Sequence, residues 1–243
     1  MRRRFFVEKF GRDTAIIRGE TAEHLGRVLR AERGQLYELS DGENVWLARV
    51  DTVTAPKRGE SKIDFALIEP VAATEPALAL HLLISLVKFD RFEWCLEKAT
   101  ELGAREIVPL AAARTDKPLI DAAAKRRVRW GKILIESAQQ ARLLKPPALG
   151  KTVRATEAFA QSPADCKILL SERPEARPMR EIVAGGSNVA QAALAIGPEG
   201  GWTVEEIAAA RAAGFAEASL GETILRTETA VIAAASVIRF AVA

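Results

Sequence analysis

Two stretches decide the fold of this chain, Ile196-Gly197-Pro198-Glu199-Gly200-Gly201-Trp202-Thr203 and Leu220-Gly221-Glu222-Thr223-Ile224-Leu225-Arg226-Thr227-Glu228-Thr229-Ala230. Each follows a short apolar run and precedes a helical pattern, so each is predicted to be a loop at the carboxyl end of a strand. In open α/β sheets, ligands bind at that edge. Two such loops in close succession therefore predict one shared binding pocket.

The first loop has the local features of a strand-to-helix turn. Residues 192–196 form an apolar run of strand length, and the glycines that follow free the backbone to take positive φ and to approach a ligand closely. Pro198 stiffens the turn. Thr203 and Glu206 have the spacing of a capping box, which predicts the start of a helix that Gly214 ends.

The second loop repeats this plan. Residues 216–220 are strand-like, Gly221 makes the turn, and Thr227 is predicted to cap an alanine-rich helix. Ordinary turns without function are the alternative for either loop alone, because glycine-rich turns are common. The pair, with Arg226 and Glu228 between apolar anchors, favours a binding site. Neither loop contains Gly-x-Gly-x-x-Gly or the P-loop pattern, which disfavours a dinucleotide dehydrogenase and a P-loop NTPase.

These loops carry a resemblance to a known family. Together they are similar to the paired signature of the ribosomal RNA small subunit methyltransferase E family, which belongs to the knotted SPOUT class of enzymes. The resemblance covers nearly the whole chain, because further segments follow in the order that this family shows. Those segments are Arg3-x-Phe5-Phe6, His24-Leu25-x-x-Val28-Leu29-Arg30, Lys98-Ala99-Thr100-Glu101-Leu102-Gly103 and Arg129-Trp130.

The resemblance implies an α/β fold, a SPOUT-type knotted and mostly parallel sheet with a small N-terminal PUA-like β-barrel domain. It implies a PUA-like RNA-binding domain over residues 1–72 and a SPOUT methyltransferase domain with a C-terminal trefoil knot over residues 73–243. It also implies a homodimer whose methyl-donor sites lie by the subunit interface. The residue pattern agrees with two domains, because short strands precede a predicted linker at residues 70–76 and strands alternate with helices beyond it.

Apolar periodicity predicts the individual elements on both sides of that linker. Before it, with Asp41-Gly42 as a hairpin turn, we expect one helix at residues 21–29 and strands at residues 3–7, 14–18, 35–40, 45–53 and 61–71. After it, we expect strands at residues 78–87, 106–110, 167–171, 192–196 and 216–220. Helices are expected there at residues 91–102, 121–140, 178–184, 204–213 and 228–242.

The resemblance implies that S-adenosylmethionine gives its methyl group to N3 of a uridine in 16S ribosomal RNA, naked or within the small ribosomal subunit. Because N3 of uracil carries a proton, transfer needs a base and stabilisation of the charge that spreads onto the flanking carbonyl oxygens. Arg226 is predicted to supply that stabilisation, since a guanidinium offers several donors. Glu199 and Glu228 are the nearest acidic candidates for the base. Either one could equally cap a helix or pair with Arg226, and capping is preferred for Glu228.

Two other interpretations stay open. Another SPOUT-class enzyme would methylate transfer RNA or a ribose 2′-oxygen. A non-catalytic RNA-binding factor would bind RNA without binding the methyl donor.

Donor contacts are expected largely from main-chain groups at three strand ends. The leucine and isoleucine side chains of the second loop would wall the adenine, with plain core packing as the alternative. The predicted donor-binding residues are Leu170, Ser171, Glu172, Ile196, Gly197, Pro198, Glu199, Gly200, Gly201, Leu220, Gly221, Ile224, Leu225, Arg226, Thr229 and Ala230.

Basic residues gather in the middle of the chain. Residues 88–154 hold 15 lysines and arginines against 8 acidic residues, although the whole chain has a formal net charge of only +3. Such a surplus can follow a phosphate backbone, and the alternative is the solvated face of a helix. Trp130, within the densest basic run, is expected to anchor a helix. The predicted RNA contacts are Arg2, Arg3, Arg4, Lys88, Arg91, Arg114, Arg126, Arg127, Arg129 and Arg142.

One segment departs from the family pattern. The family usually has Glu-Gln where this chain has Gln139-Gln140, and Arg142 lies closer to Gln140 than expected. The departure weakens any role transferred to Gln139 or Arg142.

Cysteine and histidine are too sparse for metal or disulfide chemistry. Cys95 falls on the apolar face of a predicted helix, so it is expected to be a core thiol, and no residue has metal-ligand spacing. We therefore expect no disulfide, no zinc and no other metal. Residues 78–87 are too few to span a bilayer and the basic start lacks an apolar core, so we expect a cytoplasmic protein without membrane contact.

Overall fold

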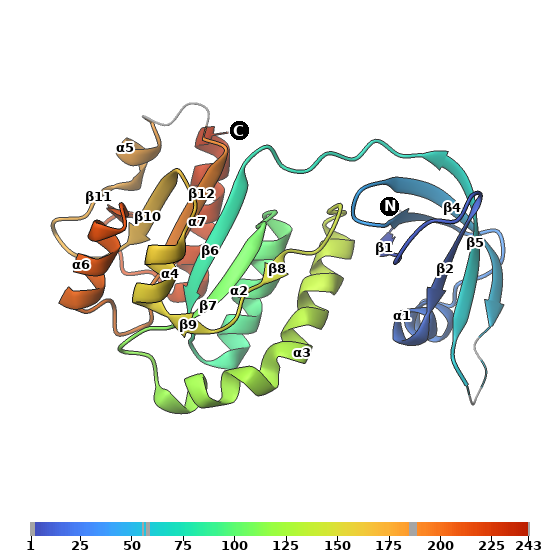
Figure 1. The fold of residues 1–243 in the computed structure, drawn as a ribbon, viewed down its shortest axis with the longest axis horizontal. Helices are drawn as coiled ribbons and strands as arrows, with labels where there is room; N and C mark the ends of the chain where they lie inside the picture. The colour runs from blue at the N-terminus through green and yellow to red at the C-terminus, as the bar shows by residue number, and fades with distance from the viewer. Residues whose placement is uncertain (1–2, 55, 57–58, 185–188, 243) are drawn as a thin grey trace. The chain divides into compact units, whose positions relative to one another are not determined.

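The computed structural model describes residues 3–54, 56, 59–184 and 189–242 (Figure 1). Contacts divide the chain into two compact units, which are Met1–Glu75 with Ala138–Lys145, and Pro76–Ser137 with Pro146–Ala243. The sequence assigned residues 138–145 to the second domain, and the structure groups them with the first unit. Two contacts within the first unit explain this, because Ser40 Oγ donates to the Leu144 carbonyl at 2.6 Å and Lys145 pairs with Glu75 at 2.7 Å.

The first unit contains a five-stranded sheet in the order β1-β3-β4-β5-β2. The β1 and β3 strands are parallel, and the other pairs are antiparallel. Among the described residues, β1 and β2 are the edges, so the predicted barrel is present in part, as a half-barrel with two open edges. The strands are β1 (Arg4–Phe6), β2 (Thr14–Arg18), β3 (Leu36–Ser40), β4 (Val45–Thr54) and β5 (Lys62–Pro70).

The core of the first unit lies between this sheet and one short helical segment. The segment starts as α1 (Gly19–Glu23) and continues as a π-helical turn, η1 (His24–Val28), where one continuous α-helix was predicted. Leu25 from that turn packs into a buried apolar cluster with strand residues such as Phe65. The predicted hairpin turn is confirmed, because the Asp41 side chain accepts two backbone N–H groups and the following glycine has φ 93°.

The second unit is built on an eight-stranded sheet whose strand pairs are all parallel. The order is β11-β13-β10-β12-β6-β7-β8, with β9 also pairing with β7. The strands are β6 (Ala79–Ser85), β7 (Glu106–Ala111), β8 (Ala148–Leu149), β9 (Val153–Arg154), β10 (Cys166–Leu170), β11 (Arg177–Pro178), β12 (Gln191–Ile196) and β13 (Ala216–Ser219).

Helices cover both faces of the parallel sheet (Figure 1). One apolar cluster joins the central strands to the helices α2, α3, α5 and α7, and a second joins them to α4 and α6. Strands buried on both sides are typical of parallel sheets. The helices are α2 (Phe89–Glu101), α3 (Lys117–Gln140), α4 (Ala155–Gln161), α5 (Met179–Val183), α6 (Val204–Ala212) and α7 (Thr227–Val242).

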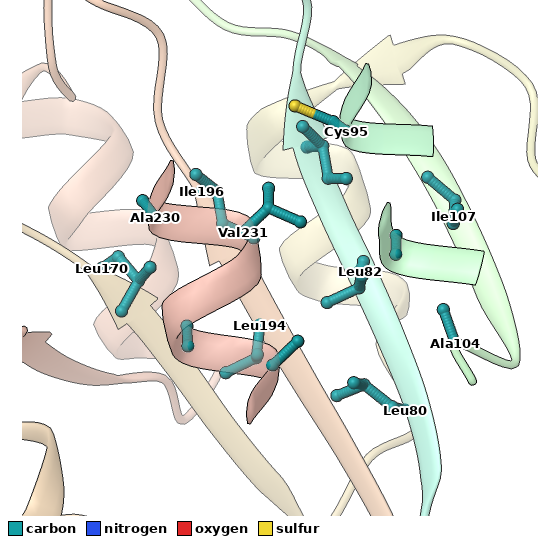
Figure 2. Packing of buried hydrophobic residues seen from close by; sticks show 14 of the residues in the cluster. Leu80, Leu82, Cys95, Ala104, Ile107, Leu170, Leu194, Ile196, Ala230 and Val231 are labelled. Atoms are coloured by element: carbon teal, nitrogen blue, oxygen red, sulfur yellow. The ribbon is translucent and has the colours of Figure 1, made fainter. Parts of the chain in front are cut away.

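The larger cluster confirms two predictions about single residues (Figure 2). Cys95 is fully buried, and burial raises the pKa of its thiol to about 12, with a further contribution from the Glu228 carboxylate. Trp130 is also fully buried and packs against Phe89 and Phe92 of α2, so it anchors α3. Neither side chain is available for chemistry.

The sequence missed β8, β9, β11 and α4. The three strands are two residues long, which is too short for an alternating pattern. The helix α4 has seven residues and makes its packing surface from Ala155, Ala158 and Phe159. About two turns of helix show too little periodicity to be predicted.

Candidate active site

A cavity of about 710 Å³ lies at the carboxyl ends of β10, β12 and β13 in the second unit. These strands are neighbours in the order β13-β10-β12 and run parallel, so the loops that follow them meet at one edge of the sheet. The predicted shared pocket is therefore present. Arg91 from the start of α2, Arg114 from the loop after β7 and Ala230 from α7 complete its wall.

Trp202 ties the first two loops together. Its indole nitrogen donates to the Leu170 carbonyl at 2.9 Å, so the end of β10 is fixed to the loop after β12. Its ring lies against Gly197, where a Cβ atom would come within 3.1 Å of the indole. The sequence expected that glycine to admit a ligand, and the structure shows that it admits this tryptophan ring.

Thr227 ties the third loop to the first. Its hydroxyl donates to the Gly197 carbonyl at 3.2 Å. Thr227 is the first residue of α7, and its role as the cap stays a prediction. The Thr203–Glu206 capping box at the start of α6 is confirmed in both directions. Positive φ values occur at Gly201 and Gly221, so each loop has one turn that favours glycine.

The cavity is lined by all of the predicted donor-binding residues except Thr229, which is exposed on α7 outside it. Glu222, Thr223 and Thr227 also line it, and they lie in the range 220–230 from which donor contacts were expected. The lining residues that were not predicted are Arg173, Pro174, Trp202, Ile207, Ala218 and Ser219.

Arg226 is the cation that the cavity leaves without a partner. Its side chain is exposed at the wall, and among the described residues it makes no hydrogen bond or ion pair. A guanidinium in this state keeps its N–H donors for a bound anion or carbonyl oxygen. Arg114 is also exposed but differs, because its Nη1 donates to the Gly200 carbonyl at 2.7 Å.

Arg91 joins the two acidic candidates for the base. It pairs with Glu199 in the first loop, and its Nε lies 3.9 Å from Glu228 Oε1. Glu228 is only 4% exposed in the first turn of α7, and among the described residues its Oε2 has no hydrogen-bond partner. Neither carboxylate pairs with Arg226. The open alternative of pairing with Arg226 is thus answered in favour of Arg91.

The structure corrects the prediction for Arg4. It was predicted to contact RNA, but it is 5% exposed and holds Glu38 on the neighbouring strand through bonds of 2.9 and 3.2 Å. Its Nη1 also donates to the Arg142 carbonyl at 2.6 Å. Arg142 is partly buried, with positive φ and an ion pair to Glu38 at 3.7 Å. Arg4 is therefore part of the packing of the first unit.

Some of the other predicted RNA contacts are exposed, and others contact protein groups. Arg3 and Lys88 are exposed, and Arg2 lies outside the described residues. On α3, Arg129 pairs with Glu93 at 2.8 Å, and the Arg126 guanidinium lies 4.8 Å from the centre of the Phe89 ring. Arg127 donates to the carbonyls of Leu149 and Gly150. None of these contacts tests RNA binding, which stays a prediction.

In the part of the chain that the structure describes, no group of three or more histidine, cysteine or acidic side chains is placed to hold a metal ion. No helix in these ranges has the length and apolar character needed to cross a bilayer.

The cavity suits an adenosyl compound. Its volume is in the range of small-molecule sites. Backbone groups of the glycine-bearing loops line it beside the apolar Leu220 and Leu225, as a purine requires. The hydroxyl of Ser171 offers a partner for a ribose, and the carboxylate of the exposed Glu172 offers one for an ammonium group.

Comparison with known proteins agrees with this geometry. Residues 74–239 match the RNA methyltransferase domain family. A ribosomal RNA small subunit methyltransferase E from Synechocystis sp. is 35% identical over 212 residues, which cover 85% of this chain and 66% of that protein. The chain belongs to the ribosomal RNA small subunit methyltransferase E family. The resemblance found in the two loops is thereby confirmed.

Two further members extend the match over almost the whole chain. The Bacillus subtilis member is 29% identical and covers 93% of this chain and 90% of its own length. The Neisseria gonorrhoeae member, solved bound to S-adenosyl methionine, is 26% identical and superimposes with a TM-score of 0.86 over 100% of this chain and 98% of that one. The predicted α/β fold with a parallel sheet is confirmed as well.

Proposed function

We propose that this protein transfers the methyl group of S-adenosylmethionine to N3 of a uridine in 16S ribosomal RNA. The observation that carries the proposal is the cavity at three parallel strand ends with the unpartnered Arg226 at its wall, in a member of this family. A ribosomal RNA substrate would place the enzyme in the cytoplasm.

The bound sulfonium donor supplies an activated methyl carbon, so the protein has mainly to align the groups and exclude water. Backbone groups of the loops after β10, β12 and β13 would hold the donor. Arg226 would donate hydrogen bonds to a uracil carbonyl oxygen as negative charge develops there. Glu199, exposed at the cavity, is the candidate acceptor for the N3 proton, and its pairing with Arg91 fixes its position.

RNA would reach this cavity with its target base unpaired or flipped out, because N3 faces the pairing partner in a duplex. We propose residues 1–72 as a PUA-like RNA-binding domain and residues 73–243 as the SPOUT methyltransferase domain. The exposed basic side chains of Arg3, Lys88 and Arg114 support RNA contacts on both. Phosphate binding by such residues would make affinity depend on salt.

We further propose the trefoil knot and the homodimer of the SPOUT class. In support of the knot, the chain leaves β13 and reaches α7, which packs on β12 and α2, so the second loop has to cross the carboxyl end of β10. In support of the dimer, α7 carries Phe240 with 92% of its surface exposed, and Ile224 in the adjoining loop is 77% exposed. Large exposed apolar side chains of this kind mark interaction surfaces.

The decisive experiment identifies the methylated nucleoside. The protein is incubated with labelled donor and either naked 16S RNA or assembled small subunits, and the digested RNA is analysed by mass spectrometry. We expect 3-methyluridine in one of the two substrates. A methylated ribose, or label only in transfer RNA, would replace the proposal by another SPOUT activity. RNA binding without donor binding in calorimetry would replace it by a non-catalytic factor.

A further inference from the structure

Glu206 makes one more contact than a helix cap requires. The residue is 4% exposed, and its Oε2 accepts the Thr203 backbone N–H at 2.9 Å as part of the capping box of α6. Its other oxygen, Oε1, accepts the backbone N–H of Ala113 at 2.8 Å. Ala113 lies 93 positions earlier, in the loop between β7 and α3. One buried carboxylate therefore ties two loops of the second unit together.

The residue after Ala113 is Arg114, and its side chain is placed with little freedom. Its Nη1 donates to the Gly200 carbonyl at 2.7 Å. Its Cβ would lie 3.3 Å from a Cβ atom added to Gly200, so the arginine stem and the glycine-bearing loop are in close contact. Arg114 lines the cavity and is exposed. Because a guanidinium has five N–H donors, the bond to Gly200 leaves donors for a ligand.

We propose that Glu206 is a positioning residue for methyl transfer, which acts by holding the Ala113 backbone so that Arg114 contacts the RNA acceptor at the cavity. The inference rests on the proposed function. It assigns to Glu206 a role in substrate recognition that is separate from capping α6. A guanidinium suits a phosphate or a base oxygen of RNA, so the expected effect lies on the RNA side of the reaction.

Substitution of Thr203 provides a matched control, because it disturbs the cap of α6 without removing the bond between Glu206 and the Ala113 backbone. The Thr203→Ala variant removes the hydroxyl that accepts the Glu206 N–H at 3.2 Å but leaves the contact between Glu206 and Ala113. A lost helix cap should lower the melting temperature by roughly 2–4 °C in a chain of this size. We expect the KM for RNA to stay at the wild-type value in this variant.

The test is a double-mutant cycle on kcat/KM for RNA, with Glu206→Ala, Arg114→Ala and the two combined. Loss of a hydrogen bond to a charged group should lower kcat/KM by about tenfold in Glu206→Ala, mainly through KM. If Glu206 acts through Arg114, the combined variant loses no more than Arg114→Ala alone. The dissociation constant for S-adenosylmethionine, measured by calorimetry, should remain unchanged in Glu206→Ala.

Three outcomes would overturn the inference. They are additive losses in the combined variant, an equal rise of the KM for RNA in Thr203→Ala, and an effect of Glu206→Ala on donor affinity alone. If Glu206→Ala fails to fold, Glu206→Gln replaces it in the cycle, because the amide keeps the volume and one acceptor oxygen for two N–H donors. Absence of methyl transfer by the wild-type protein to any RNA would instead refute the proposed function.

Discussion

The arginines at the cavity and the arginine of the first sheet show opposite uses of the same side chain. Arg226 is exposed at the cavity wall and has no side-chain partner among the described residues. Arg4 is buried, and the β1–β3 register places it directly opposite Glu38, which it binds. The difference shows that burial against an acidic partner turns a basic residue into part of the packing, whereas an exposed one at the cavity wall keeps donors for a ligand.

Among the substitutions that test this comparison, Arg226→Ala should have the largest effect, and that effect is on kcat. The Arg226→Ala variant removes the proposed donor to the developing charge, so kcat should fall by roughly 10²- to 10³-fold. The fold should persist, because the exposed side chain makes no hydrogen bond or ion pair among the described residues. The measurements are transfer of labelled methyl groups to RNA, and the thermal melt.

Arg180 offers the matched control for that variant. It is also an exposed arginine, but it lies on α5 outside the cavity. Arg180→Ala should therefore keep wild-type activity. Full activity in Arg226→Ala would remove this arginine from the mechanism.

Arg4 tests the other side of the comparison. The Arg4→Ala variant removes both bonds that Arg4 makes to the buried Glu38 carboxylate and leaves its ion pair to Arg142 at 3.7 Å. Breaking a buried ion pair in this way should lower the free energy of unfolding by roughly 3 kcal/mol. Urea denaturation of the full-length variant and of the wild type, monitored by circular dichroism, would measure the loss.

A second substitution sharpens this prediction. In the double variant Arg4→Met/Glu38→Leu no buried charge remains unpaired, so much of the stability should return. If Arg4→Ala is as stable as the wild type but binds RNA more weakly, the arginine belongs with the nucleic-acid contacts after all.

Two arginines of α3 are exposed like Arg226 but have an acidic neighbour like Arg4. Replacing them should give the smallest effect, a modest loss of RNA affinity. Arg126 and Arg129 are exposed but face Glu93, at 3.9 and 2.8 Å. If both contact phosphates, the variant Arg126→Ala/Arg129→Ala should bind RNA a few-fold more weakly. The slope of the logarithm of the RNA association constant against the logarithm of the salt concentration should fall in magnitude by about 1–2. Filter binding at several salt concentrations gives the slope.

Arg127 is kept in that variant because it donates to the carbonyls of Leu149 and Gly150. Its own replacement should lower stability and leave the salt slope unchanged. An unchanged slope in the double variant would assign Arg126 and Arg129 to the protein surface.

Local features explain what the sequence could predict. The capping box at Thr203 and Glu206 depends on a spacing of three residues, and the glycine-bearing loops follow apolar strands directly, so both could be recognised without the fold. The parallel sheet followed from the same alternation of strands and helices.

Partners far apart in the chain explain what could not be predicted. The contact of Glu206 with Ala113 spans 93 positions, and that of Arg4 with Glu38 depends on strand register. The Thr227 hydroxyl donates to the Gly197 carbonyl, 30 positions away, which no local pattern predicts. In each case a side chain with several allowed partners took one that only the tertiary structure provides.

The segment Ala138–Lys145 has a consequence for exchanging parts between relatives. Arg142, Leu144 and Lys145 meet Arg4, Ser40 and Glu75, so the first unit is completed by residues encoded more than sixty positions after it. A chimaera that joined the first 75 residues of one relative to the remainder of another would bring mismatched surfaces together at these contacts. A successful graft has to transfer residues 138–145 along with the N-terminal segment.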